Sequence, residues 1–185
     1  AMDSISGVSL AVIGNDRICS FLTKNTHSDD FLSAYTSAYS DVETYCQNNR
    51  YILGARIDAI RGGGTISTSG LLGGYEISNE EKARMRKFQE PWFWTMEANG
   101  KVGFCRLIRN KYDNFNQIGY LKIILNGDAF WPQSYQIQST DSARYALIDT
   151  RDDRVVLVSD NSIWESVSAL YEENYNEIKY NRHLI

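Results

Sequence analysis

Two apolar segments near the middle of the chain constrain its fold most strongly. The segments VGFCRLIRN (102–110) and IGYLKIILN (118–126) are joined by the polar stretch KYDNFNQ (111–117). Strand-forming residues on both sides of a short polar connection predict two antiparallel strands. The sequence therefore predicts a fold that is organised around an antiparallel sheet.

Further elements are expected on the N-terminal side of this pair. Residues 28–49 show a helical period, with Ser28 or Asp29 as the expected N-cap. Residues 5–22 are expected to form an earlier helix. The alternation in YILGARIDAI (51–60) predicts a strand, RGGGT (61–65) a turn, and TISTSG (65–70) a second strand. The apolar stripe of the 28–49 helix consists of Phe31, Leu32, Tyr35, Ala38, Tyr39, Val42, Tyr45 and Cys46.

Three more elements follow along the chain. Ser78 and Glu81 have the spacing of a capping box, which predicts a helix over 79–90 that ends before Pro91. The segment 143–160 predicts another hairpin, with its turn at 151–154, and 162–178 predicts an amphipathic helix. No regular crossover helices separate the strands, so we expect an α+β fold and not a parallel nucleotide-binding sheet.

Composition excludes several classes of protein. The net charge is -4 and no basic stripe occurs, which argues against nucleic acid and against anionic membrane surfaces as partners. No apolar run approaches the roughly 20 residues of a membrane span, and no basic leader segment is found. The three cysteines, Cys19, Cys46 and Cys105, predict free thiols, which suit the cytosol or an extracellular domain of an anaerobe.

Residues with catalytic potential are few. His27 and His183 have no companion at metal-ligand spacing, so we expect no metal and no cofactor. The acidic pairs at 152–153 and 172–173 are interpreted as solvated charge. The glycines at 62–64 lack the lysine of a phosphate-binding loop. This inventory favours a binding module. The alternatives are a small α+β hydrolase that uses paired carboxylates and an assembly protein whose sheet edge recruits a partner strand.

Two stretches of the chain resemble a known family. EPWFWTMEANGKVGFCRLIRNKYDNFNQIGYLKIIL (90–125) and YALIDTRDDRVVLVSD (145–160) follow the course of Cache domains, the PAS-like extracellular sensor domains of bacterial membrane receptors. The resemblance implies an α+β fold with an antiparallel PAS-like sheet and a long N-terminal helix. It places the sensor domain at 28–160, after a helical segment at 1–27. A C-terminal helix at 161–185 would follow, with the possible start of a truncated membrane-proximal strand.

The resemblance also implies a function. The segments RLIRN and IGYLKIIL are most similar to those of sensor histidine kinases of Gram-positive bacteria. We therefore expect an extracellular ligand-sensing domain that relays small-molecule binding across the membrane. The domain itself would be soluble and without catalysis, and its parent a membrane-anchored homodimer with a histidine kinase. The sensor domain of a chemoreceptor or a cyclase is the alternative.

The expected site follows from the same family. Its pocket is formed by the concave face of the sheet, and the segment around 91–94 is the expected cover. Aromatic rings suit a sugar ring, and Arg106 is a fixed charged donor. Core packing is the alternative role for the rings, and a surface ion pair or solvent exposure is the alternative for Arg106. The candidate ligand-binding residues are Tyr75, Trp92, Trp94, Arg106 and Tyr120.

One departure from the family bears on the ligand. Members that bind amino acids have an arginine before Pro-Trp-Tyr and an aspartate on a later strand. Glu90 precedes Pro91 in this sequence, and the corresponding strand carries Lys122 with no acid. A sugar or an organic acid is therefore expected as the ligand, and an amino acid is not.

Overall fold

The computed structural model describes residues 2–62, 64–71, 74–87, 92–97, 101–126, 129, 146–149 and 154–158. The chain divides into two compact units, Ala1–Pro132 and Gln133–Ile185. In the second unit, β6 (Ala146–Asp149) pairs antiparallel with β7 (Arg154–Val158), which confirms the hairpin predicted for 143–160. The predicted C-terminal helix and the predicted boundary at residue 160 lie outside the described residues.

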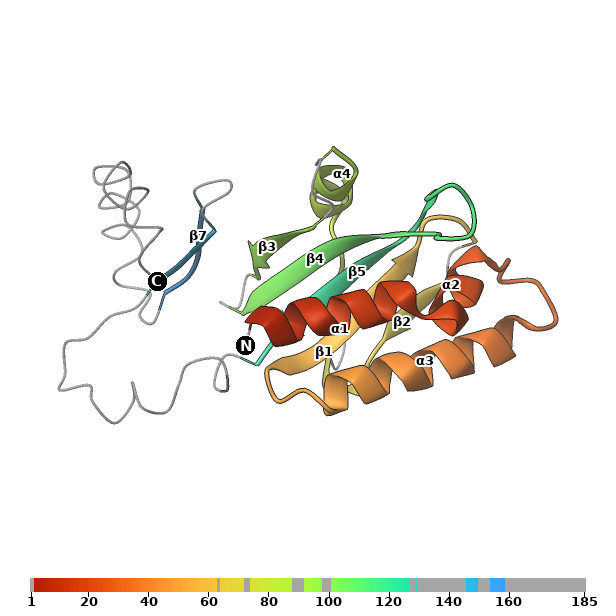
Figure 1. Ribbon diagram of the computed structural model, residues 1–185, viewed down its shortest axis with the longest axis horizontal. Helices are drawn as coiled ribbons and strands as arrows, with labels where there is room; N and C mark the ends of the chain where they lie inside the picture. The colour runs from red at the N-terminus through yellow and green to blue at the C-terminus, as the bar shows by residue number, and fades with distance from the viewer. Residues whose placement is uncertain are drawn as a thin grey trace. The chain divides into compact units, whose positions relative to one another are not determined.

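The first unit is built on a five-stranded sheet in the order β2-β1-β5-β4-β3, and all neighbouring strands are antiparallel (Figure 1). This result confirms the α+β class and the antiparallel pair at its centre. The strands are β1 (Ile52–Ala59), β2 (Thr65–Ser67), β3 (Trp92–Met96), β4 (Val102–Arg109) and β5 (Gln117–Leu125). The helices are α1 (Met2–Gly14), α2 (Asp16–Thr23), α3 (Phe31–Gln47), the short 3₁₀ helix η1 (Ser69–Leu71) and α4 (Asn79–Lys87).

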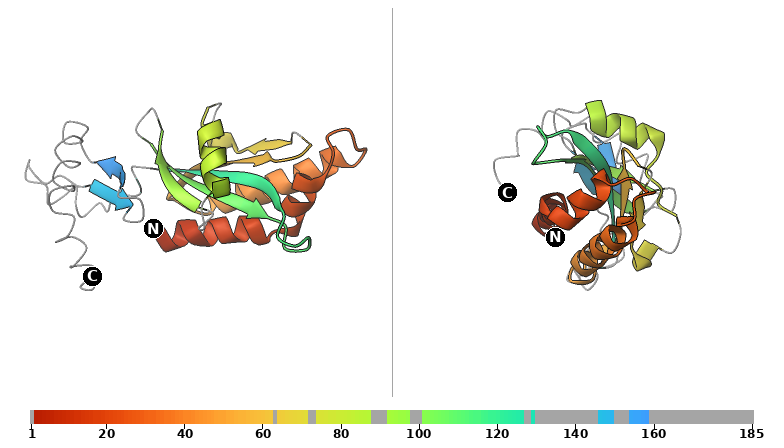
Figure 2. Two further views of the ribbon diagram at one scale, coloured as in Figure 1. Left: turned by 90° about the horizontal axis from the view of Figure 1, so that it is seen from above. Right: turned by 90° about the vertical axis from the view of Figure 1, so that its right-hand side faces the viewer.

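Helices cover both faces of this sheet (Figure 2). We call the face that packs against α1, α2 and α3 the helix face, and the opposite one the α4 face. The assignment follows from alternation along the strands. Arg106 donates a hydrogen bond to Ser9 of α1, whereas its neighbours Cys105 and Leu107 pack with Met85 of α4.

The N-terminal region forms two helices, so the single helix predicted for 5–22 is wrong. Asn15 interrupts it, because its side-chain oxygen accepts hydrogen bonds from the backbone N–H groups of Arg17 and Ile18 and so caps α2. Its amide group donates to Asp41 and Tyr45 of α3, which fixes the break in place. No single helix among the described residues has the length and apolar character to span a membrane, but Asp3–Gly14 and Asp16–Thr23 meet that criterion as a pair bent by 58°.

The helix predicted over 28–49 is α3, with two corrections. Asp30 is at the N-cap position, while Ser28 uses its hydroxyl to bond the carbonyl of Asn25. Leu32 is 72% exposed, because Phe31 turns toward Phe21 of α2 and the next residue points about 100° away from it around the helix. The buried part of the predicted stripe is Ala38, Val42 and Cys46.

The first predicted hairpin is confirmed, although its second strand is short. Gly62 has φ +82° in the turn, a conformation that glycine adopts without strain. The β2 strand ends at Ser67, and the hydroxyl of Thr68 accepts a hydrogen bond from the N–H of Ala55 in place of a ladder carbonyl. The chain then enters η1.

The capping box that begins α4 is confirmed. The N–H of Ser78 donates to Glu81 Oε2 at 2.8 Å, and the N–H of Glu81 donates to Ser78 Oγ at 3.1 Å. This reciprocal pair fixes the first turn of α4 and the position of the Glu81 carboxylate. The predicted end of the helix at Pro91 lies outside the described residues.

Candidate functional site

The α4 face of the sheet combines an apolar cluster with buried charge. Residues 74–87, named here the α4 cover, lie over this face and contribute α4 and the stretch before it. Side chains from β3, β4 and β5 point toward the cover. The apolar cluster consists of Ile77, Met85, Phe93, Cys105, Leu107 and Tyr120.

Lys122 is the centre of the charged part. It lies in the central strand β5 and is only 2% exposed. Its Nζ is 2.9 Å from Glu81 Oε1 and 2.7 Å from Glu97 Oε1, and it donates to the carbonyl of Glu76 at 3.1 Å. The ammonium thus forms ion pairs with two carboxylates, and it also donates a hydrogen bond to Glu81 Oε2 at 3.2 Å. The ion cluster joins the sheet to the start of the cover, to the first turn of α4 and to the residue after β3.

Gly103 of β4 makes room for this cluster. A Cβ atom at that position would lie 3.1 Å from Glu97 Oε1, 3.4 Å from Lys122 Cε and 2.7 Å from Thr95 Cγ2. A larger side chain would therefore clash with Thr95 and press on the Glu97 carboxylate. The glycine in GKVGFC thus leaves space for both side chains.

The electrostatic environment keeps Lys122 charged. Burial alone would lower its pKa, but hydrogen bonds to Glu97 and Glu81 outweigh burial, so the pKa of Lys122 is raised. Burial raises the pKa of Glu97, and Lys122 offsets this only in part. Burial, with the charge of Glu81, raises the pKa of the Cys105 thiol well above its usual range. The thiol is therefore protonated and is not a nucleophile at neutral pH.

A second ion cluster, next to the one around Lys122, holds α4 on the sheet. Asp58 of β1 is buried and accepts from Arg56 Nε at 2.9 Å, and its other oxygen is 2.8 Å from Lys82 Nζ. Two successive residues of α4 thus form ion pairs with two different strands: Glu81 pairs with Lys122 of β5, and Lys82 pairs with Asp58 of β1. Such an arrangement fixes the register of α4 on the sheet.

Tyr120 is paired with Asp58 across the strands and lies two residues before Lys122, so it sits between the two ion clusters. Lys82 Nζ and Arg86 Cζ are 5.8 Å and 5.4 Å from the centre of its ring. Its hydroxyl oxygen is buried and has no hydrogen-bond partner among the described residues. An unsatisfied buried hydroxyl costs about 1–3 kcal/mol, so a partner from outside would be favourable.

The five predicted ligand-binding residues do not line one pocket. Trp92, Trp94 and Arg106 point to the helix face, because Trp92 pairs with Arg106 and Trp94 with Phe104. Tyr120 points to the α4 face, and Tyr75 belongs to the α4 cover, with φ +57°. The sheet therefore separates the first three from Tyr120.

The predicted cover of the pocket is also wrong. Residues 92–94 lie in the edge strand β3, hydrogen-bonded to β4, and so they form part of the sheet that they were expected to cross. The side chains of this strand alternate, which buries Phe93 on the α4 face and leaves Trp92 and Trp94 half-buried on the other. Residues 74–87 are the segment that lies over the α4 face.

Sequence reasoning missed the acids that pair with Lys122. Glu81 was expected only as a helix cap, and it is 41 residues away from Lys122 along the chain. One signal was present: a lysine inside the apolar run IGYLKIIL must be neutralised if the strand is central. The sequence could not indicate which of its many acids fills that role.

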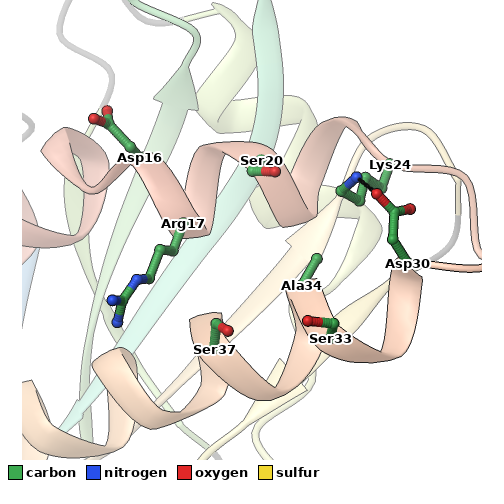
Figure 3. Close-up of a pocket in the computed structure, with 8 residues that line it drawn as sticks. All are labelled: Asp16, Arg17, Ser20, Lys24, Asp30, Ser33, Ala34 and Ser37. Carbon is green, nitrogen blue, oxygen red and sulfur yellow. Dashed lines mark hydrogen bonds and ion pairs between the residues drawn. The ribbon is translucent and has the colours of Figure 1, made fainter.

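One concave surface lies away from both clusters, between α2 and α3 (Figure 3). Its volume is about 340 Å³. Its charged groups are already paired: Arg17 with Asp41 at 3.3 Å, and Lys24 with Asp30, whose side chains point toward one another in Figure 3. The lining residues are Asp16, Arg17, Ser20, Lys24, Asp30, Ser33, Ala34 and Ser37.

This groove contains none of the predicted site residues, and most of its side chains are exposed. The described part of the chain also contains no group of three potential metal ligands. The groove can offer serine hydroxyls to a polar molecule, but it holds no buried donor that would fix a ligand in place.

No model of a known protein family matches this sequence, and no curated protein matches it either. The described first unit is an α+β domain with one five-stranded antiparallel sheet, three helices on one face and a charged cluster beneath α4 on the other. We therefore infer function from the geometry of the two faces.

Proposed function

We propose that this chain is the extracellular ligand-sensing domain of a bacterial sensor histidine kinase, built on a PAS-like sheet of the Cache type. A small molecule, a sugar or an organic acid, binds beneath the α4 cover. The domain carries out no reaction itself. The parent protein is a membrane-anchored homodimer, and the activity of its kinase depends on whether the ligand is bound.

The architecture supports this proposal. The order β2-β1-β5-β4-β3, with every neighbour antiparallel, is compatible with a PAS-like sheet. Three helices pack on one face and the α4 cover on the other, so a ligand between sheet and cover would lie against the apolar cluster and the ion clusters. The N-terminal helices pack on the back of the same sheet, so a change in the sheet reaches them directly.

The buried hydroxyl of Tyr120 is the observation that carries the proposal. It lies under α4 and has no hydrogen-bond partner among the described residues. The charged groups of Lys82 and Arg86 lie over the ring of the same tyrosine. A buried polar group without a partner is uncommon, and such groups cluster where a ligand or an ordered water completes the site. A hydroxyl or carboxyl group of a small molecule would supply the missing partner.

The two ion clusters supply a means of relay. The α4 cover is fixed by Glu81 to Lys122 and by Lys82 to Asp58, and both contacts are directional. A ligand that contacts Tyr120 and competes for either pair would favour a different position of the cover. Binding then shifts the population between two arrangements of cover and sheet, and the helix face transmits that shift toward the membrane.

A second candidate function has one observation in its favour. Glu81 and Glu97 converge on one point, and the raised pKa of Glu97 suits a general acid, as expected of a hydrolase with paired carboxylates. However, Lys122 occupies the point of convergence and forms an ion pair with both carboxylates. The cluster is therefore better suited to holding the cover than to acting on a substrate.

The test is a thermal-shift screen of the whole chain against sugars, organic acids and amino acids. A ligand that binds the folded state raises the melting temperature by mass action. Tyr120→Phe should remove most of that rise. Without ligand, the same substitution should leave stability equal or slightly higher, because it deletes an unsatisfied hydroxyl.

Tyr112→Phe is the matched control, since Tyr112 is exposed on the β4–β5 loop. The proposal fails if no compound in these classes stabilises the protein, or if every stabilising compound acts equally on the Tyr120 variant. The parent gene should encode a membrane span on each side and a histidine kinase behind. A chemoreceptor or cyclase output there would redirect the proposal, and turnover of a screened compound would favour the hydrolase.

A further inference from the structure

Arg106 is a half-buried cation without a counter-charge among the described residues. It lies in β4 on the helix face, and its Nη1 donates a hydrogen bond to Ser9 Oγ at 2.9 Å. Ser9 is fully buried on the sheet side of α1, and its hydroxyl donates a hydrogen bond to the carbonyl of Ser6. The Nε of Arg106 is buried, with no acceptor in the described part of the chain.

This situation differs from that of the other cations inside the sheet. Arg56 is paired with Asp58, and Lys122 with Glu81 and Glu97. Burial lowers the pKa of the Arg106 guanidinium, and no nearby carboxylate opposes that effect. A guanidinium stays charged at neutral pH, so the domain bears the cost of this partly desolvated charge. An anion at this place would remove that cost.

The surroundings of Arg106 are aromatic. Trp92 of β3 is its direct cross-strand partner, and Phe104 lies two residues before it on the same face. Trp92 stacks on Phe104 with ring centres 5.4 Å apart, and Trp94 meets Phe104 edge-on at 4.9 Å. Because β3 is an edge strand and both tryptophans are half-buried, this wall lies at the rim of the sheet. Aromatic faces favour a ligand whose body is apolar.

We propose that Arg106, Ser9, Trp92 and Trp94 form a binding site for a small organic acid, with its carboxylate on the guanidinium and its apolar body against the indole rings. A carboxylate can accept two parallel hydrogen bonds from one edge of a guanidinium, and Nε is the donor that now lacks an acceptor. Since Nε has no contact with solvent, the side chains around the guanidinium must move slightly to admit the acid.

The site would couple the ligand to α1. The hydrogen bond from Arg106 to Ser9 joins the sheet to the first helix of the chain, and a carboxylate competes for the same guanidinium. This site lies on the opposite face of the sheet from the one proposed above, and it depends on the proposed sensing function for its biological role. The binding site itself depends only on the geometry around Arg106.

The experiment uses benzoate and hexanoate as probes, with benzamide as the uncharged match for benzoate. Affinity is measured on the whole chain by the concentration dependence of the melting temperature and by tryptophan fluorescence. Both acids should raise the melting temperature of the unmodified chain, and benzamide should not. Arg106→Gln should weaken benzoate binding by more than about tenfold, because charge and fork are both lost.

Arg109→Gln is the matched control, since Arg109 ends the same strand and is exposed. It should bind benzoate as the unmodified chain does. Where Arg106→Gln fails to fold, Arg106→Lys keeps the charge but loses the planar fork, and it should also weaken benzoate binding. Equal binding of benzoate by the Arg106 and Arg109 variants, or no response to either acid, would overturn the inference.

These outcomes are separable from the fate of the sensing function. Benzoate binding that is absent or independent of Arg106, together with a ligand that depends on Tyr120, refutes the site on the helix face and leaves the sensor proposal standing. If benzoate binds through Arg106 but the gene encodes no membrane span and no signalling output, the sensor proposal is refuted and the site on the helix face stands.

Discussion

Three helices cover one face of the central sheet, and α4 with the stretch before it covers the other. The helix face is held mainly by apolar contact. Its central side chains are almost fully buried: Ile57, Leu121 and Ile123 from the strands, and Phe21, Leu22 and Val42 from the helices. The α4 face buries an apolar cluster as well, but it adds two ion clusters at successive residues of α4.

The two faces differ in which changes of conditions can weaken their packing. Apolar burial is proportional to area, has no direction and depends little on pH. Ion pairs depend on geometry, protonation and competing charge, and one broken partner leaves the other charge buried. The apolar contacts of the helix face should therefore change little with pH, while the ion pairs of the α4 face can be altered by acid as well as by a ligand. Substitutions on the two faces should therefore differ in how strongly their effect on stability depends on pH.

Lys122→Met should have the largest effect. It leaves the carboxylates of Glu81 and Glu97 close together without their cation, which costs about 3–5 kcal/mol of unfolding free energy at neutral pH. Acid should reduce the loss, because the carboxylate of Glu97, whose pKa is raised by burial, becomes protonated. The loss should also shrink in base: the folded pKa of Lys122 is raised above 10.5, so its contribution is complete below that pH and disappears as pH rises through the folded pKa.

Urea unfolding at several pH values measures this prediction. Lys111→Met provides the control, since Lys111 makes its ion pair with Asp16 at the surface and should change stability little. A Lys122 variant as stable as the unmodified chain at neutral pH would show that the α4 face does not depend on its ions.

Leu121→Ala tests the other face of the same strand. Leu121 is fully buried, and its truncation should cost about 3 kcal/mol through lost apolar contact and the cavity that remains. In contrast to the Lys122 variant, this loss should be constant with pH, because no titrating group is removed. The same urea series measures it. A loss that vanished in acid would mean that the helix face is also held by charge.

Much of this architecture follows from local sequence patterns. The alternation in β1, β4 and β5, the turn at Gly62 and the capping box at Ser78 all predict their elements, because each depends on residues close together in the chain. The break at Asn15 was missed, since its amide needs partners in α3 that are distant in sequence.

The site was harder to predict for the same reason. Aromatic residues at 92–94 indicate a wall but not its orientation, and a shift of one residue along a strand moves a side chain to the other face. Glu81, Glu97 and Lys122 come from three separate elements. Only the packed sheet determines that these three meet.

Ser78→Ala tests whether the N-terminal cap of α4 holds the α4 cover in place. The substitution removes the hydroxyl that accepts from the N–H of Glu81, and loss of an N-cap costs about 1 kcal/mol. Because Glu81 serves both the cap and Lys122, the loss should be smaller when it is measured in the Lys122→Met background. A double-mutant cycle of urea unfolding measures that coupling. Ser33→Ala, at an exposed position of α3, is the control and should be neutral.

Additive losses in that cycle would contradict the coupling and would separate the start of α4 from the ion cluster. Losses that couple would instead mean that cap and ion pair hold the cover as one unit.

Glu97→Gln should have the smallest effect at neutral pH, below about 1 kcal/mol, because the attraction to Lys122 is offset by the burial of the carboxylate. Its signature lies in the pH dependence. Burial raises the pKa of Glu97 above 4.5, so the folded chain holds this proton more tightly than the unfolded chain. Stability therefore falls as pH rises from 4.5 through the folded pKa, and the glutamine variant should lack that fall. Glu80→Gln, exposed on the first turn of α4, should keep it. If the Glu97 variant keeps the same slope in that window, its carboxylate does not titrate as part of the cluster, and the α4 face loses its predicted sensitivity to acid.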